Sequence, residues 1–182
     1  RRIFYADLYL TQILNNYFSR NKFIASFFSY ITHTSGGGTY IFYFIILPFL
    51  PELTNNMLTN KQASFIWIYG GTAFILFQVP IYFTLKQYVK RNRPYEYNYT
   101  KMLIKAPDKY SFPSGHCASA TLITLLMFNQ DVFLAPLFLI WMTLILISRI
   151  GLGIHYITDV IGGLILGSVT YLVALHLSNF KL

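Results

Sequence analysis

Three short polar clusters interrupt an otherwise apolar chain and contain the residue types that could do chemistry. They are Lys86-x6-Arg93-Pro94, Pro113-Ser114-Gly115-His116 and Ser148-Arg149-x5-His155-x3-Asp159. Ionisable side chains are costly near a bilayer, so cations, imidazoles and a carboxylate at the ends of apolar runs indicate a functional site. The clusters therefore predict a membrane enzyme.

The cations and the helix start among these clusters indicate a site for a phosphoryl group. Lys86, Arg93 and Arg149 supply positive charge, and arginine adds a planar fork that matches phosphate oxygens. Ser114 and Gly115 stand where a loop enters an apolar run. A helix beginning there would present free backbone N–H groups and the positive end of its dipole. We predict that these five residues bind the substrate, in an arrangement that also stabilises a phosphoryl-transfer transition state.

Two histidines and one carboxylate indicate how a phosphoryl bond could be broken. If a helix begins at residue 155, His155 and Asp159 are one turn apart on the same face, and the carboxylate can accept a hydrogen bond from one ring nitrogen. The other nitrogen is then free to act as a nucleophile. His116 lies beside the predicted phosphate site and is the expected general acid. No metal and no cofactor are expected, because the three cations already neutralise charge.

The composition predicts an integral membrane protein with a single all-α domain over residues 1–182. Only 11% of the residues are charged and 55% are hydrophobic, whereas ordinary soluble domains carry about a quarter charged residues. Five or six transmembrane helices are expected. Residues 1–36 are expected to form amphipathic helices in the membrane interface, and residues 62–177 the catalytic core. The expected spans are 38–50, 63–85, 116–128, 132–148 and 158–177.

This layout predicts that the three clusters meet on one side of the membrane. The span 63–85 ends at Lys86, and the next span begins near Gly115, so the first two clusters share a face. The chain then crosses twice, through 116–128 and 132–148, and returns Arg149 and His155 to that face. The polar stretch between residues 86 and 112 would supply the rest of the site.

The ordered clusters resemble the three-part signature of the type 2 phosphatidic acid phosphatase superfamily, which also includes the soluble vanadate haloperoxidases. The resemblance covers residues 62 to 177 and every motif position, whereas residues 1 to 61 match no signature. It implies a helical core, a phosphohistidine intermediate on His155 and acid catalysis by His116. It also implies metal-independent hydrolysis of a phosphate monoester or pyrophosphate.

The expected partners are the lipid bilayer and a phosphorylated membrane lipid, without nucleic acid. The candidate substrates are the 1-phosphate of lipid A, phosphatidylglycerol phosphate and undecaprenyl pyrophosphate, and the strongly basic face favours an enzyme resembling the lipid A 1-phosphatases. A phosphotransferase that passes the phosphoryl group to a second lipid remains an alternative. A membrane transport or structural protein is the non-enzymatic alternative, although few polar residues besides Gln78 fall at mid-span.

Net charge bears on the orientation of the chain in the membrane. The formal net charge is +8, and 14 residues are Lys or Arg. All of these except Lys61 and Lys181 fall on the face of the clusters if the N-terminal segment lies on that side. The positive-inside tendency would turn this face to the cytoplasm, whereas the family resemblance implies the periplasm. We expect a multi-pass protein of the bacterial inner membrane with a periplasmic active site.

Three further expectations concern residues outside the predicted machinery. Cys117, the single cysteine, is expected to pack as a small buried residue. Gly163-x3-Gly167 is expected to form a close helix-packing face. Asp108 and Glu96 are expected to be simple loop charges.

Overall fold

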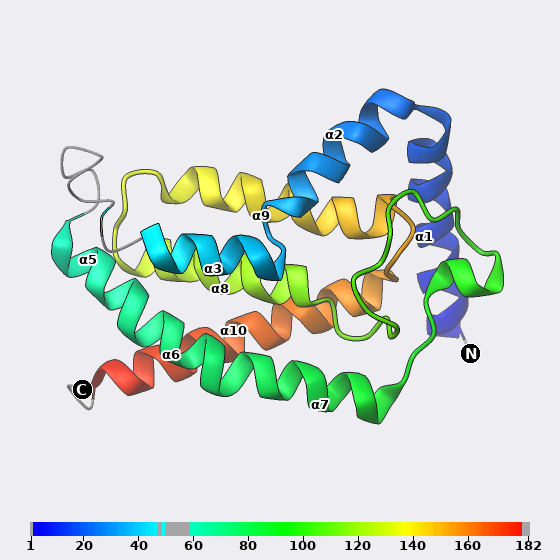
Figure 1. Cartoon of the computed structure of the whole chain (residues 1–182). Coiled ribbons are helices and arrows are strands. Elements are labelled where there is room, and N and C mark those ends of the chain that lie inside the picture. The colour runs from blue at the N-terminus through cyan, green and yellow to red at the C-terminus, as the bar shows by residue number, and fades with distance from the viewer. Residues whose placement is uncertain (1, 47–48, 50–58, 180–182) are drawn as a thin grey trace.

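The computed structural model describes residues 2–46, 49 and 59–179, and this part of the chain is all helix and loop, without strands (Figure 1). The prediction of an all-α fold is confirmed. The α-helices are α1 (Arg2–Arg20), α2 (Lys22–His33), α3 (Gly37–Ile46), α5 (Asn60–Phe65), α6 (Gly71–Ala73), α7 (Val79–Val89), α8 (Gly115–Asn129), α9 (Ala135–Gly151) and α10 (Ile157–Asn179). Residues 47–48 and 50 of the expected span 38–50 lie outside the described residues.

The elements α5, α6 and α7 form one continuous helical rod, because the stretches between them, Ile66–Gly70 and Phe74–Gln78, are π-helical turns. A capping box starts the rod: the Gln62 N–H donates to Thr59 Oγ1 at 3.3 Å, and the Thr59 N–H donates to Gln62 Oε1 at 2.8 Å. Lys90 ends it in the left-handed conformation, at φ 47°. The rod therefore begins slightly earlier and ends slightly later than the expected span 63–85.

Among the described residues, two stretches are long and apolar enough to cross a membrane by length and composition. They are Asn60–Tyr97, which contains the rod and the short segment after it and has a mean hydropathy of 1.5 over an 18-residue window, and Ile157–Asn179, with 2.0 over such a window. The apolar helix α9 is shorter. The number of spans, predicted as five or six, thus stays a prediction.

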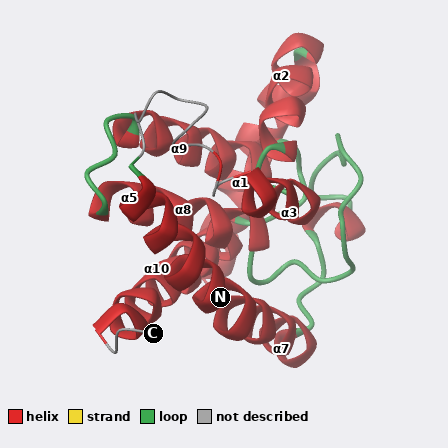
Figure 2. Ribbon diagram, turned by 60° about the vertical axis from the view of Figure 1, so that its left-hand side comes forward, coloured by secondary structure: helices red, strands yellow, loops and turns green. Residues whose placement is uncertain are grey.

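The helix α8 lies between α9 and α10 in both views of the ribbon (Figures 1 and 2). Its contact with α10 is close at two glycines of α10. A Cβ atom on Gly163 would lie 2.5 Å from the Ser114 carbonyl oxygen, and one on Gly167 would lie 2.3 Å from that of Ala118. The close-packing prediction for Gly163-x3-Gly167 is confirmed, and Cys117 is fully buried as expected.

The helix α1 lies across the end of the bundle, against the end of α9 (Figure 1). Its buried Asn15 donates to the carbonyl oxygens of Gly151 at 2.9 Å and Lys101 at 3.0 Å. The same side chain accepts from the Lys101 N–H at 2.7 Å. Asn15 therefore fastens both the end of α9 and the long loop to α1.

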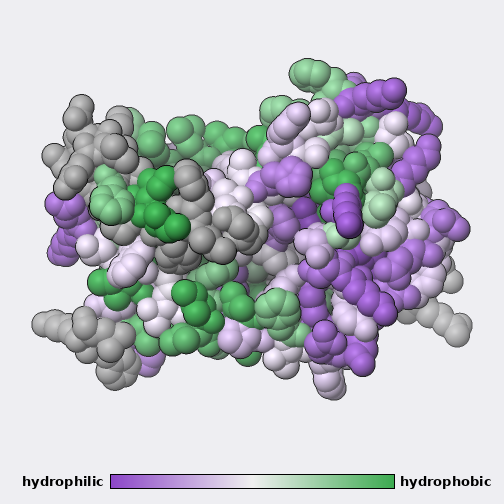
Figure 3. Space-filling model, in the orientation of Figure 1, coloured by the Kyte–Doolittle hydropathy of each residue, from purple (hydrophilic) through white to green (hydrophobic). Residues whose placement is uncertain are grey.

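The surface divides into a polar end and an apolar body (Figure 3). Hydrophilic residues gather at the end of the molecule where α1 and the loop between α7 and α8 lie. Large apolar side chains on the helices are exposed, among them Leu76 at 73% and Leu172 at 60%. An exposed apolar body of this kind is what a bilayer would cover.

Candidate active site

The residues predicted for the site all lie at the polar end of the bundle, on the ends of helices and in the loops beside them. Lys86 lies in the last turn of α7 and Arg149 in the last turn of α9. Ser114 is the N-cap of α8, followed by Gly115 and His116 in its first turn. Arg93 lies in the loop after α7, His155 in the turn after α9 and Asp159 in the first turn of α10.

His155 and Asp159 are neighbours, although not within one helix as predicted. The helix α10 begins at Ile157, so His155 stands before it. Asp159 Oδ2 accepts a hydrogen bond from the Tyr156 N–H at 2.8 Å, which fixes this helix start. It lies 3.5 Å from His155 Nδ1, and it also accepts from the Ser111 hydroxyl. The carboxylate thus faces Nδ1 of the imidazole, and Ser111 is a member of the site that spacing did not indicate.

The other nitrogen of His155 faces a guanidinium group. His155 Nε2 lies 3.3 Å from Nη1 of Arg93, which is fully buried and donates to the Ile154 carbonyl oxygen at 2.7 Å. Burial, followed by the charges of Arg93 and Arg149, holds the pKa of His155 well below its ordinary value. The imidazole is therefore neutral near pH 7. A neutral ring with a proton on Nδ1 leaves a lone pair on Nε2.

Asp108 is more than the loop charge that the sequence indicated. Its Oδ1 lies 2.7 Å from Lys86 Nζ and 2.7 Å from Arg93 Nη2. Its Oδ2 accepts from the Tyr82 hydroxyl at 2.5 Å. Burial opposes ionisation of this carboxyl, but the hydrogen bonds from Lys86 and Tyr82 and the nearby cations outweigh it, so its pKa lies below the ordinary value. Asp108 is an anion held between two of the predicted phosphate-binding cations.

Arg149 is the third predicted cation, and part of its guanidinium has no hydrogen-bond partner among the described residues. It is buried and donates through Nη1 to Thr32 Oγ1 of α2 at 2.8 Å. Its Nε and Nη2 are buried without a hydrogen-bond partner among the described residues. Buried donors on a cation suit an anionic ligand, since an unsatisfied donor costs about 1–3 kcal/mol.

His116 approaches the same region from the start of α8. It is partly buried, and a Cβ atom on Gly36 would lie 3.7 Å from its Nε2. The turn between α2 and α3 therefore lies beside its imidazole. His116 also interacts electrostatically with Arg149 and His155. The start of α8, the end of α9 and the turn before α10 thus bring both imidazoles to one region.

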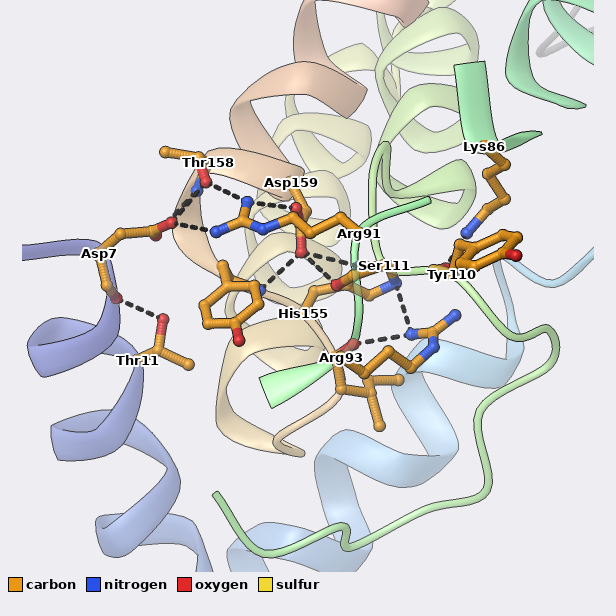
Figure 4. A network of polar contacts seen from close by, with 12 residues as sticks. Asp7, Thr11, Lys86, Arg91, Arg93, Tyr110, Ser111, His155, Thr158 and Asp159 are labelled. Carbon is orange, nitrogen blue, oxygen red and sulfur yellow. Dashed lines mark hydrogen bonds and ion pairs between the residues drawn. The ribbon is translucent and has the colours of Figure 1, made fainter. Parts of the chain in front are cut away.

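A second network joins α1 to this region (Figure 4). Arg91 contacts both Asp7 of α1 and Asp159 of α10. Neither Arg91 nor Asp7 belongs to a predicted cluster.

The described part of the chain contains no group of three or more His, Cys, Asp or Glu residues that could hold a metal ion. Metal independence remains a prediction.

Comparisons with known proteins agree with this arrangement. Residues 63–182 match the family model described as the PAP2 superfamily. A decaprenylphosphoryl-5-phosphoribose phosphatase from Mycobacterium tuberculosis is 33% identical over 103 residues, which cover 56% of this chain and 55% of that protein. An undecaprenyl-diphosphatase from Sulfolobus acidocaldarius is 38% identical over 79 residues, which cover 42% of this chain and 38% of that protein. The chain spans about half the length of the first of these relatives.

Two solved structures share the fold. One is a transmembrane PAP2 type phosphatidylglycerolphosphate phosphatase from Bacillus subtilis, with a TM-score of 0.74 and 20% identity, covering 100% of this chain and 89% of that chain. The other is LpxE from Aquifex aeolicus, with a TM-score of 0.72 and 21% identity, covering 93% of this chain and 94% of that chain. The first likeness covers the whole chain and so includes α1 to α3, which precede the family match.

Proposed function

The chain belongs to the PAP2 superfamily, and from this premise we propose that it is a membrane phosphatase that removes phosphate from an anionic envelope lipid through a phosphohistidine on His155. The main observation behind the proposal is the environment of the His155 ring. The ring is buried and neutral, with Nδ1 toward Asp159 and Nε2 toward Arg93. A nucleophile with this orientation is aimed at a group that cations would bind.

The proposed reaction has two steps. Nε2 of His155 attacks the phosphorus, and the bond to the leaving oxygen breaks as His116 donates a proton to that oxygen. Lys86, Arg93 and Arg149 neutralise the charge on the phosphoryl oxygens, with the backbone N–H groups of Gly115 and His116. Asp159 stabilises the imidazole once it becomes positively charged.

In the second step a water molecule attacks the phosphohistidine. His116, now neutral, accepts a proton from that water, and the N–P bond breaks to release phosphate and restore His155. The phosphotransferase alternative differs only here, because a lipid hydroxyl would take the place of water. No step draws on a metal ion.

The substrate is proposed to be a lipid whose phosphate lies in the headgroup plane. Phosphatidylglycerol phosphate, undecaprenyl pyrophosphate and the 1-phosphate of lipid A are the candidates, joined by a prenyl-linked phosphosugar because of the mycobacterial relative. A largely apolar cavity of about 600 Å³ between α3, the α5–α7 rod, α8 and α9 supports a long-chain substrate. Its lining includes Tyr40, Phe74, Leu126 and Trp141.

The proposed setting is a bacterial inner membrane. In this arrangement five spans cross the bilayer, α1 and α2 lie in the interface, and the polar end faces the periplasm. The exposed aromatic side chains Phe23 and Tyr30 of α2, at 81% and 75%, support an interfacial position for that helix.

The direct test is phosphate release from a panel of these lipids by the purified protein in detergent, with His155→Ala as the control. We expect turnover of at least one lipid that persists in EDTA, is inhibited by vanadate and is absent from the variant. Inactivity of the wild-type protein on every lipid would favour the transport or structural alternative. A strict requirement for magnesium would contradict the mechanism.

A further inference from the structure

Both terminal nitrogens of Arg91 donate hydrogen bonds to protein groups. Nη1 donates to Asp159 Oδ1 at 2.7 Å and to Thr158 Oγ1 at 2.6 Å. Nη2 donates to Asp7 Oδ2 of α1 at 2.8 Å. Figure 4 shows the guanidinium between the two carboxylates. This residue therefore neutralises a pair of acidic groups, of which one is the carboxylate facing His155.

The contacts of Arg91 extend along the segment that contains the proposed nucleophile. Its guanidinium lies over the ring of Tyr156, at 3.9 Å from the ring centroid. Tyr156 directly follows His155, and the Thr158 and Asp159 contacts follow within three residues. One side chain thus holds the turn before α10 and the first turn of that helix.

Asp7 secures the arrangement from α1. Its Oδ1 accepts from the Thr158 N–H at 3.1 Å, and its Oδ2 accepts from the Thr158 hydroxyl at 2.5 Å. The N–H groups of a first helical turn have no partner within their own helix. Asp7 satisfies one of them in α10 from a different helix, and its side chain is only 3% exposed.

Arg91 differs from the cations proposed to bind phosphate. Arg149 has two buried nitrogens without a partner among the described residues, whereas both terminal nitrogens of Arg91 are committed to carboxylates and a hydroxyl. Removing Arg91 would leave the buried carboxylates of Asp7 and Asp159 without this cation, which is strongly unfavourable. The expected response is movement of Asp159 and of the turn that contains His155.

We propose that Arg91 is a positioning residue that fixes Asp159 and the His155 turn, and that Asp7 makes α1 part of the active site by holding Arg91. This inference rests on the proposed phosphatase function. It assigns a role to a helix that precedes the family match over residues 63–182. It also explains why a helix expected to lie in the membrane interface has a buried carboxylate at its inner face.

The test compares steady-state kinetics of Arg91→Gln with the wild-type protein on the lipid that the wild type hydrolyses best. We expect kcat to fall about 10- to 100-fold, because small displacements of a reacting group cost about this much. KM should stay within about twofold, because the phosphate-binding cations are untouched. Arg91→Lys should recover part of kcat by restoring the charge without the fork.

Asp7→Asn tests whether α1 contributes to the positioning of the site. It should lower kcat less than Arg91→Gln does, and the loss in the double variant should be smaller than the product of the two single losses, since Asp7 acts partly through Arg91 and partly through Thr158. Asn15→Ala is the matched control, because it loosens the docking of α1 at Gly151 and Lys101 without touching the network. It should lower thermal stability and leave kcat within about twofold of the wild type.

The outcomes separate the inference from the function on which it rests. Wild-type inactivity on all lipids would overturn the proposed function itself. An active wild type whose Arg91→Gln variant keeps kcat, or loses activity only through KM, would overturn the positioning role alone. An equal loss of kcat in Asn15→Ala would also overturn it. If Arg91→Gln does not fold, the kcat values of Arg91→Lys and Asp7→Asn test the positioning role instead. Unchanged kcat in both variants would contradict the proposal.

Discussion

Burial, together with the cations proposed to bind phosphate, keeps His155 neutral. Burial and the neighbouring cations Arg93 and Arg149 lower the pKa of His155, whereas an exposed imidazole titrates near pH 6.5. We expect the NMR signals of the His155 ring in the ligand-free protein to titrate with a midpoint below the ordinary value of about 6.5. His155→Gln would identify the signals, and a titration midpoint near or above pH 6.5 would contradict this assignment.

The lowered pKa of His155 also has a consequence for stability. On acidification the unfolded chain binds this proton before the folded protein does, so the contribution of His155 to the free energy of unfolding falls as the pH drops below about 6.5. The Asp108 carboxyl acts in the same direction at lower pH, because its pKa is lowered in the fold and its contribution is lost as it becomes protonated.

Asp108 competes with phosphate for Lys86 and Arg93 in the proposed mechanism. Replacing it with Asn removes that negative charge while keeping the side-chain shape. We expect Asp108→Asn to bind orthophosphate and vanadate about threefold to tenfold more tightly, measured as inhibition of lipid hydrolysis, because the pair is partly exposed and the effect is screened. Weaker inhibition would show instead that Asp108 mainly holds the two cations in position. Glu96→Gln is the control, because Glu96 is exposed on the short 3-10 helix Pro94–Tyr97.

The sequence could predict the motif residues but not the groups that hold them. Spacing and residue type were enough to propose that His116, Arg149 and His155 share a region. The partners of Arg91 could not be found this way, because Asp7 and Asp159 lie 84 and 68 positions from it in the sequence. From the sequence alone Asp108 could not be distinguished from any other loop carboxylate, because its contacts form only when the loop folds back onto α7.

At the scale of elements, the site depends on how closely α8 and α10 pack. Gly167→Val would place side-chain atoms against the Ala118 backbone, where even a Cβ atom would lie only 2.3 Å from the carbonyl oxygen. We expect it to lower the free energy of unfolding by about 1–3 kcal/mol and to reduce activity, because α8 and α10 both begin at the site. Thermal unfolding and phosphate release would measure these effects.

Ile165→Val is the matched control, because Ile165 is 59% exposed on the same helix. It should leave unfolding and activity nearly unchanged. A Gly167→Val protein as stable and active as this control would mean that the close contact of α8 with α10 does not position the site.

The helix boundaries show what periodicity can and cannot reveal. Apolar runs located α8, α9 and α10 within a few residues. The helix start at residue 155 that would place His155 and Asp159 on one helical face was not found, because it depends on a side chain: Asp159 accepts from the Tyr156 N–H and so leaves His155 in the turn before α10. The π-helical turns of the α5–α7 rod leave no mark in an apolar sequence.

At the scale of the whole molecule, the orientation in the membrane follows from which end a water-soluble reagent reaches. Lys101 is exposed at the polar end of the molecule. Lys61 is exposed at the start of the α5–α7 rod, which is the end of the rod away from the site. We expect Lys101→Cys, and not Lys61→Cys, to react with a membrane-impermeant thiol reagent on intact cells. The wild-type protein is the blank, because its single cysteine, Cys117, is fully buried. The reverse pattern would turn the active site to the cytoplasm, as the charge bias favours.

The most direct test of the whole account is to trap the phosphorylated enzyme. The protein is mixed with a hydrolysable lipid labelled in its phosphate and quenched within one turnover under alkaline conditions, and its peptides are analysed by mass spectrometry. The account predicts a phosphoryl group on His155 in the wild-type protein and none in His155→Ala. Phosphate release by the wild type with label on another residue, or undiminished release by His155→Ala, would contradict it.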